Sequence, residues 1–290
     1  MSRSPDPPDH RHRNQRGVGG AGIALRIAIV VVAVLIVAGG VYAYGAITRS
    51  QSDPNRQAAW AGRTATAVAT GPQGTLYVAF LREIYRIDPT RGTVTLIAGR
   101  AQDPGSAQPA AAPDGQPAVG AAIRPTSLAV GPQGQVYFTD LLGQTVRTIA
   151  GGDLKSIGRA AQVGGVAVDE ATGTVYFSDQ RKDQVFAVNP TSGGVSTIAG
   201  NGQPGFAGDG AAAGSAELSA PSGLAVERSS TLLIADSGND RIRQVDLRTG
   251  IITTVAGNGH GGIAGDGGQA VKAQLTDPVA VTESPDGGFV

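Results

Sequence analysis

The chain has 290 residues, with 23 basic and 23 acidic side chains, 44 glycines and no cysteine. The absence of cysteine excludes disulfide bonds and thiolate metal sites. The zero net charge gives no case for a nucleic-acid partner, because such partners attract an excess of basic residues.

The first 22 residues contain too few apolar side chains to bury a core, so they predict a disordered, basic cytoplasmic tail. A run of 21 uncharged and mostly apolar residues, IAIVVVAVLIVAGGVYAYGAI, follows at 27–47. At about 1.5 Å per residue, a helix of this length crosses a hydrocarbon core of about 30 Å. We therefore expect one transmembrane helix over residues 23–47 and a linker over residues 48–63.

Arginines flank this run unequally. Five precede it and three follow within a similar distance (Arg3, Arg11, Arg13, Arg16 and Arg26; Arg49, Arg56 and Arg63). The positive-inside rule then places the N-terminus in the cytoplasm and the rest of the chain outside the cytoplasmic membrane. The alternative is a cleaved signal peptide, with an apolar core at 27–38 and a small-residue cleavage site at Val41-Tyr42-Ala43, which would give a secreted protein.

From residue 64 the chain repeats a unit of short apolar runs. Each unit starts with a quartet: SLAV at 127–130, GVAV at 165–168, GLAV at 223–226, PVAV at 278–281, and a weaker copy at 67–70. A turn and a second run such as TLLIAD (231–236) come next, then a third run such as RIRQVD (241–246) and, in most units, a fourth. The steps are 60, 38, 58 and 55 residues, counted from Val68 to Leu128, Val166, Leu224 and Val279.

Four short strands in about 40 residues are the period of a β-propeller blade. The runs are apolar at successive positions, as expected for sheets that are covered on both faces. The longer steps exceed the shortest by 17 to 22 residues, which we assign to inserts between blades. The pattern predicts an all-β propeller over residues 64–290, with about four blades and the start of a fifth.

Residues 223–259, GLAVERSSTLLIADSGNDRIRQVDLRTGIITTVAGNG, resemble an NHL repeat, and the inserts resemble the linkers of long-linker NHL repeats. The likeness covers residues 64–290, strongly in the last two units and weakly in the first. It implies a β-propeller, usually of six blades, that serves mostly in binding. One known arrangement is an extracytoplasmic sensor domain on a single membrane helix. On this comparison the chain would be an incomplete six-bladed propeller.

The strands of a blade alternate in direction, so the loops between second and third strands share one face with the linkers between blades. We call this the linker face. The phrase AGNGQPGFAGDG at 199–210, repeated as AGNGHGGIAGDGG at 256–268, is such a linker. Loops on a rigid scaffold commonly carry binding, so we predict ligand contacts from Asn201, Asp209, Asp236, Asn239, Asp240, Arg241, Asn258, His260 and Asp266. Because Asp140, Asp179 and Asp236 recur in successive blades, a structural role as turn caps or arginine partners is the alternative.

Other chemistry is disfavoured. Both copies of the glycine phrase fit G-x-G-x-x-G, but further glycines follow where a nucleotide site needs a helix, so we expect no nucleotide. The GDG turns offer oxygen ligands without the spacing of a calcium loop, and His260 is the only histidine of residues 64–290. We therefore predict no metal, no cofactor and no enzymatic activity.

The predicted function is a membrane-anchored extracytoplasmic binding, sensor or scaffold protein for a protein, peptide or envelope glycan. The alternative is a propeller-type lyase or lactonase whose catalytic residues lie mainly in missing blades.

Overall fold

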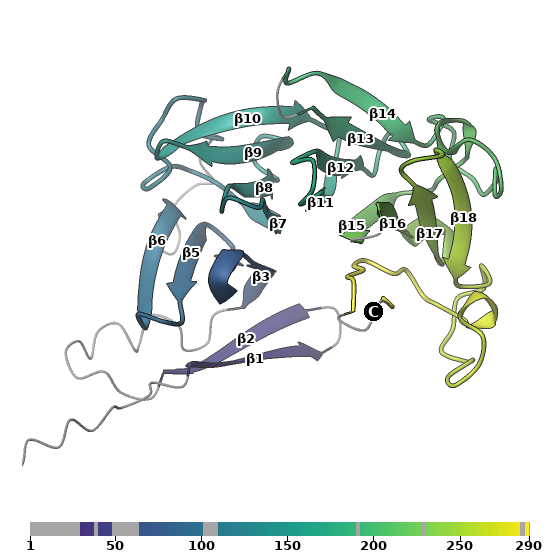
Figure 1. The fold of residues 1–290 in the computed structure, drawn as a ribbon, viewed down its shortest axis with the longest axis horizontal. Coiled ribbons are helices and arrows are strands. Elements are labelled where there is room, and N and C mark those ends of the chain that lie inside the picture. Colours follow the sequence, from purple (N-terminus) through teal and green to yellow (C-terminus); the bar gives the residue numbers. More distant parts are fainter. Residues whose placement is uncertain are drawn as a thin grey trace, which may run out of the picture.

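A computed structural model describes residues 30–37, 40–47, 64–100, 110–189, 192–227, 230–284 and 288–289. It contains four four-stranded antiparallel sheets, in each of which neighbours in sequence are neighbours in the sheet. Figure 1 shows these sheets as blades arranged in an arc around a common axis. The all-β propeller architecture and the count of four blades agree with the sequence prediction.

We name the blades A to D. Their strands are β3 Ala65–Thr70, β4 Leu76–Phe80, β5 Glu83–Asp88 and β6 Thr93–Gly99 in blade A; β7 Pro125–Val130, β8 Val136–Asp140, β9 Thr145–Ala150 and β10 Asp153–Arg159 in blade B; β11 Val163–Val168, β12 Val175–Asp179, β13 Gln184–Val188 and β14 Val195–Ala199 in blade C; and β15 Pro221–Glu227, β16 Thr231–Asp236, β17 Arg241–Asp246 and β18 Ile251–Ala256 in blade D. Single 3-10 turns lie at Pro72–Gly74, Ala213–Ser215, Ser237–Asn239 and Ala270–Lys272.

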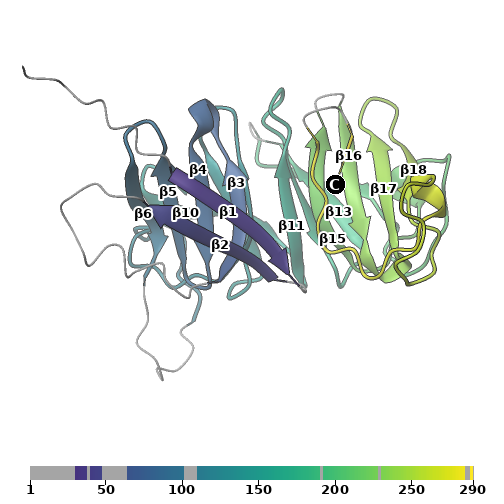
Figure 2. The same ribbon diagram turned by 90° about the horizontal axis from the view of Figure 1, so that it is seen from below.

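The first strand of each blade lies closest to the axis and the fourth lies at the rim (Figure 1). Seen edge-on, the strands run between the two faces of the disc (Figure 2). Apolar side chains of adjacent blades form the cores between them: Ile84 with Phe138, Val146 with Phe177, and Val185 with Leu232 belong to three successive clusters. Burial on both sheet faces explains why the runs are apolar at successive positions.

The fourth strand of blade B, β10, was not predicted. Its sequence DLKSIGR has only two large apolar residues, of which Leu154 is buried and Ile157 is half-buried. A rim strand is covered on fewer sides than an inner strand, so its pattern contains fewer apolar residues.

The start of the fifth blade lies in a different register from the predicted one. Val281 is buried against Leu233 and Ala235 of blade D, whereas Val279 is 62% exposed. Val281 therefore takes the position of Leu224, and the last step is 57 residues, the same distance that separates the two copies of the glycine phrase. A bridge between Glu283 and Phe289 begins the pairing of a second strand.

The structure does not show the transmembrane helix predicted at 23–47. Instead, β1 Val30–Val37 and β2 Gly40–Ile47 pair as an antiparallel hairpin, and β2 lies beside β3 on the open side of the arc (Figure 1). In the described part of the chain, no helix is long and apolar enough to cross a membrane. The segment is rich in β-branched valine and isoleucine, which suit strands, and a continuous apolar run does not distinguish a helix from a strand by its period. The predicted tail and the linker at 48–63 lie outside the described residues.

Candidate functional site on the linker face

The aspartates that end the second strands are buried and hold backbone N–H groups. Asp140 Oδ1 accepts hydrogen bonds from the N–H groups of Arg124 (2.9 Å) and Leu142 (3.1 Å). Asp236 Oδ1 accepts one from Ser219 (2.7 Å), and Asp179 accepts several, including one from Gln162 (3.0 Å). Each aspartate thus fixes the segment that leads into the first strand of its own blade.

Two of these aspartates also pair with a buried arginine of the third strand. The guanidinium of Arg243 lies 3.3 Å from Asp236 Oδ2 and 2.7 Å from Asp209 Oδ1, the aspartate of the GDG turn. Arg147 repeats this arrangement, at 3.5 Å from Asp140 and 3.8 Å from Asp114. In blade C, which no long linker precedes, Phe186 takes the place of this arginine. It pairs with Phe177 as Arg147 pairs with Phe138 in blade B. The arginine therefore accompanies a linker that contains an aspartate.

Burial raises the pKa of both Asp140 and Asp236, against the opposing effect of their hydrogen bonds and of the neighbouring arginines. For Asp114, burial acts in the same direction, but bonds from Ser156 and the charge of Arg147 outweigh it and lower the pKa. The pKa values of Asp140 and Asp236 in the blades and of Asp114 in the first long linker are therefore shifted in opposite directions.

The long linkers reach further than the linker face. The Gly210 N–H donates to Ile252 O (2.8 Å) and the Ala213 N–H donates to Gly250 O (2.8 Å), near the far end of the rim strand β18. The first long linker contacts β10 in the same way, with the Gly115 N–H bonded to Leu154 O (2.8 Å). The expectation that the inserts lie on one face is thus incomplete, because they also run along the rim strands.

The glycine phrase is a structural turn in the described chain. Gly200 has a φ of 87°, and a Cβ there would lie 2.1 Å from Asp183 O, so only glycine fits. Asn201 Oδ1 accepts the Gln203 N–H (2.8 Å), and its amide bonds to Ser215 O (3.3 Å). Asn258 repeats both bonds, with the His260 N–H (2.9 Å) and with Lys272 O (3.1 Å).

The predicted residues of the blade D loop are close together and also engaged internally. Asn239 donates to Gly205 O (2.7 Å) and to Asp236 (2.8 Å), and Asp240 accepts the Asp277 N–H (2.8 Å). Arg241 donates to Asn239 O and Asn258 O, and its guanidinium lies 3.7 Å from the ring centroid of Phe206. Phe206 is 42% exposed, so this aromatic–cation pair faces solvent.

The third linker has the same internal fold but lies open. The N–H groups of Gly257 and Asn258 bond to Ala270 O and Ala273 O, as those of Gly200 and Asn201 bond to Ala213 O and Ala216 O. His260 and Asp266 are exposed, and Ile263, which takes the position of Phe206, is 94% exposed. Of the nine predicted site residues, Asp236 is thus buried, and the side chains of six others make contacts within the chain: Asn201, Asp209, Asn239, Asp240, Arg241 and Asn258. The remaining two, His260 and Asp266, are exposed.

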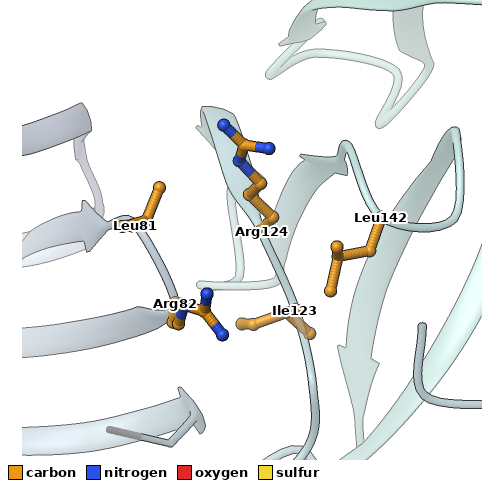
Figure 3. Close-up of a pocket in the computed structure, with 5 residues that line it drawn as sticks. All are labelled: Leu81, Arg82, Ile123, Arg124 and Leu142. Carbon is orange, nitrogen blue, oxygen red and sulfur yellow. The ribbon is translucent and has the colours of Figure 1, made fainter. Parts of the chain in front are cut away.

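Two cavities were not predicted from sequence. One of about 150 Å³ lies between blades A and B and is lined by Leu81, Arg82, Ile123, Arg124 and Leu142 (Figure 3). The other, of about 640 Å³, lies on the opposite face at the ends of the innermost strands. Its lining includes the carboxylates Asp169, Glu170, Glu227 and Glu283. Among the described residues, no group of three or more His, Cys, Asp or Glu side chains could hold a metal ion.

The third-strand arginines also escaped prediction. The usable signal was their position seven residues after the aspartate, at Arg147 and Arg243, in the two blades that follow a long linker.

The solved structures that are similar to this chain are propellers or contain propellers, and their sequence identity to it is low. An auxiliary nutrient binding protein from Bacteroides thetaiotaomicron has a TM-score of 0.56 at 12% identity, covering 77% of this chain and 55% of that one. A nidogen/laminin complex gives 0.53 at 16%, covering 78% and 71%, and a streptogramin B lyase gives 0.50 at 13%, covering 78% and 60%. At these identities the likeness concerns the fold alone.

Two curated relatives match parts of the propeller. Teneurin-m of Drosophila melanogaster is 31% identical over 162 residues, which are 50% of this chain and 6% of that protein. Protein SUPPRESSOR OF QUENCHING 1, chloroplastic, of Arabidopsis thaliana is 38% identical over 78 residues, or 27% of this chain and 7% of that protein. The chain thus spans less than a tenth of either relative. A family model, the teneurin NHL domain, matches residues 109–261, more than half of the chain. The chain belongs to this family of NHL-repeat β-propellers.

Proposed function

We propose that the protein is a binding propeller whose linker face contacts a protein, peptide or envelope glycan. The observation that carries this proposal is the solvent-facing pair of Phe206 and Arg241, 3.7 Å apart, on loops that hydrogen bonds hold in place. Aromatic residues and arginine are enriched at protein interfaces, and rigid loops lose little entropy on binding. Ile263 extends this surface onto the next linker.

The similar propellers support a binding role in general. One is described as an auxiliary nutrient binding protein and another is part of a nidogen/laminin complex. Neither description transfers a ligand to this chain, because the likeness concerns the fold. The ligand class therefore rests on the linker face itself.

The test compares variants of the two faces. Phe206→Ala and Ile263→Ser change the linker face, while Glu170→Lys and Glu227→Lys change the opposite face. We expect retention of envelope proteins and glycans by the immobilised protein to fall with the first pair and to persist with the second. If only the second pair abolishes retention, the linker face is the wrong surface.

We also propose that the propeller is displayed outside the cytoplasmic membrane. This rests on sequence alone: the 21 uncharged residues at 27–47 and the excess of arginine before them. A bilayer-spanning segment must satisfy its own backbone groups, so these residues would cross as a helix and not as the β1–β2 hairpin. The protein should then stay with membranes after a carbonate wash, and a protease added outside spheroplasts should digest the propeller. Release into the wash, or a soluble form starting near Tyr44, would contradict the anchor.

A second candidate function is a lyase or lactonase. It is favoured by the 640 Å³ recess with four carboxylates at the axis, since general acids and bases act in such recesses. This alternative would be established if the protein turned over cyclic esters, if Glu227→Gln abolished the turnover and if the linker-face variants remained active.

A further inference from the structure

The junction between blades A and B lacks a contact that the other described junctions share. At the end of the loop between second and third strands, Asp183 and Asp240 accept the N–H groups of Ala220 and Asp277, which lead into the following blades (both 2.8 Å). Gln144 does the same for Val163 (2.9 Å). A carboxylate or amide oxygen at this position thus joins one blade to the next.

In blade A this position is Arg82. Its carbonyl lies against Gly99 as the carbonyls of Asp183 and Asp240 lie against Gly200 and Gly257, which establishes the equivalence. A guanidinium has no acceptor, so Arg82 cannot make the contact. The residue opposite is also an arginine, Arg124, and its N–H bonds to Asp140 of its own blade. The junction therefore has an arginine on each side where the others place an acceptor and a donor.

The cavity of about 150 Å³ lies at this place (Figure 3). Both arginines are half-buried, and among the described residues neither guanidinium has a carboxylate within ion-pair distance. Leu81, Ile123 and Leu142 form the apolar part of the wall, and Leu81 is 50% exposed at the rim. Asp140 fixes the backbone of both Arg124 and Leu142, so the wall is held in place, while neither guanidinium is paired with a carboxylate of the described residues.

We propose that this junction binds a carboxylate side chain, a glutamate or aspartate next to aliphatic residues, in a peptide segment of a partner protein. Arginine pairs with carboxylates through strong, directional hydrogen bonds, and the leucines suit the flanking aliphatic groups. The size favours a side chain over a free ligand, because sites for small molecules measure about 300 to 1,000 Å³. This inference rests on the proposed function, since it names a partner chemistry for the linker face.

The experiment titrates the full chain, in neutral detergent, with acetyl-Ala-Leu-Glu-Leu-Ala-amide and with the same peptide carrying glutamine in place of glutamate. We expect the glutamate peptide to bind at least about tenfold more tightly, the gain typical of a hydrogen bond to a charged group. Arg82→Gln and Arg124→Gln should each remove this preference. Blade C carries glutamine, Gln162, at the position where Arg124 bonds to the aspartate, so that substitution suits the fold.

Arg91→Gln is the control, because Arg91 is an exposed arginine of blade A on the opposite face. It should leave the preference unchanged. Equal affinity for the two peptides, no binding of either, or an equal loss in Arg91→Gln would overturn the inference. Phe206→Ala separates it from the proposed function: this variant should lose the natural partner yet keep the preference for the glutamate peptide. If the partner is retained by the linker face while the two peptides bind alike, only the carboxylate site is wrong.

Discussion

At the scale of single residues, Asp140 and Asp236 occupy the same position in two blades, but their buried carboxylates are not equally well hydrogen-bonded. Asp236 Oδ2 receives Asn239 and Arg243, whereas Asp140 Oδ2 is buried without a hydrogen bond and has only the ion pair with Arg147 at 3.5 Å. A buried charge that is incompletely paired costs free energy. Blade B therefore contains the less satisfied copy.

The pH dependence of stability should show this cost. Burial raises the folded pKa of Asp140 above 3.8, so the native state holds the proton more tightly than the unfolded chain. Its contribution to the free energy of unfolding is then full below the unfolded pKa and is lost as the pH rises through the folded pKa. Relative to Asp140→Asn, the wild type should gain stability as the pH falls from 7 to 4, measured by urea unfolding. Asp88→Asn is the opposite control, because hydrogen bonds lower the pKa of Asp88. A pH-independent difference for Asp140→Asn would contradict the assignment.

A comparison of Gly200, in the glycine phrase, with Gly193, in the turn before β14, gives a second prediction for single residues. Gly193 has a φ of 68° and open space around it, so Gly193→Ala should cost about 1 to 2 kcal/mol from backbone strain alone. Gly200→Ala adds a clash with Asp183 O and should cost clearly more, about 3 kcal/mol or above. Thermal and urea unfolding of both variants measure the difference. Equal losses would mean that the turn can move away from blade C.

At the scale of elements, the linker and the third strand form one unit. Asp209→Asn should weaken the bond to Arg243 and open the linker at 200–218, raising its rate of limited proteolysis about tenfold, the effect of losing part of a charged hydrogen bond. Asp266→Asn is the matched control in the next linker, because Asp266 is exposed and no arginine of the described chain lies against it. If both variants are cleaved at equal rates, the aspartate does not hold the linker.

Sequence predicts the blades better than the contacts between them. The apolar runs and turns of GLAVERSSTLLIAD are local signals, so four blades and their linkers follow from the repeat. Strand β10 was not predicted because its rim sequence contains few apolar residues. The last quartet was placed in the wrong register because PVAV can be aligned with its apolar residues in two ways. The pairs Asp114–Arg147 and Asp209–Arg243 join residues more than 30 positions apart, which only the folded linker brings together. The cavity at Arg82 and Arg124 depends on the same long-range geometry.

At the scale of the whole molecule, each blade covers its neighbour, and the last segment has one uncovered side. In the second long linker Ala213, Ala216 and Leu218 are buried between blades C and D. In the third, the equivalent Ala270 is exposed and Ala273 and Leu275 are half-buried. The apolar Ile263, Val271 and Val279 of the same segment are 94%, 45% and 62% exposed. Repeat arrays gain stability mainly by covering such faces, and exposed apolar strands promote association.

We therefore expect residues 50–290 to self-associate through this surface. Full burial of one isoleucine or valine contributes about 1.5 to 3 kcal/mol, so burying Ile263 and Val279 together strengthens a weak dimerisation by about two to four orders of magnitude. Light scattering over a concentration series should show oligomers for the wild type and a shift towards monomer for Ile263→Ser with Val279→Ser. Val195→Ser, at a 50% exposed valine of blade C, is the control and should leave the oligomers in place. A monodisperse monomer of the wild type at every concentration would mean that the uncovered side is too small, or too well shielded by the third linker, to attract a second copy.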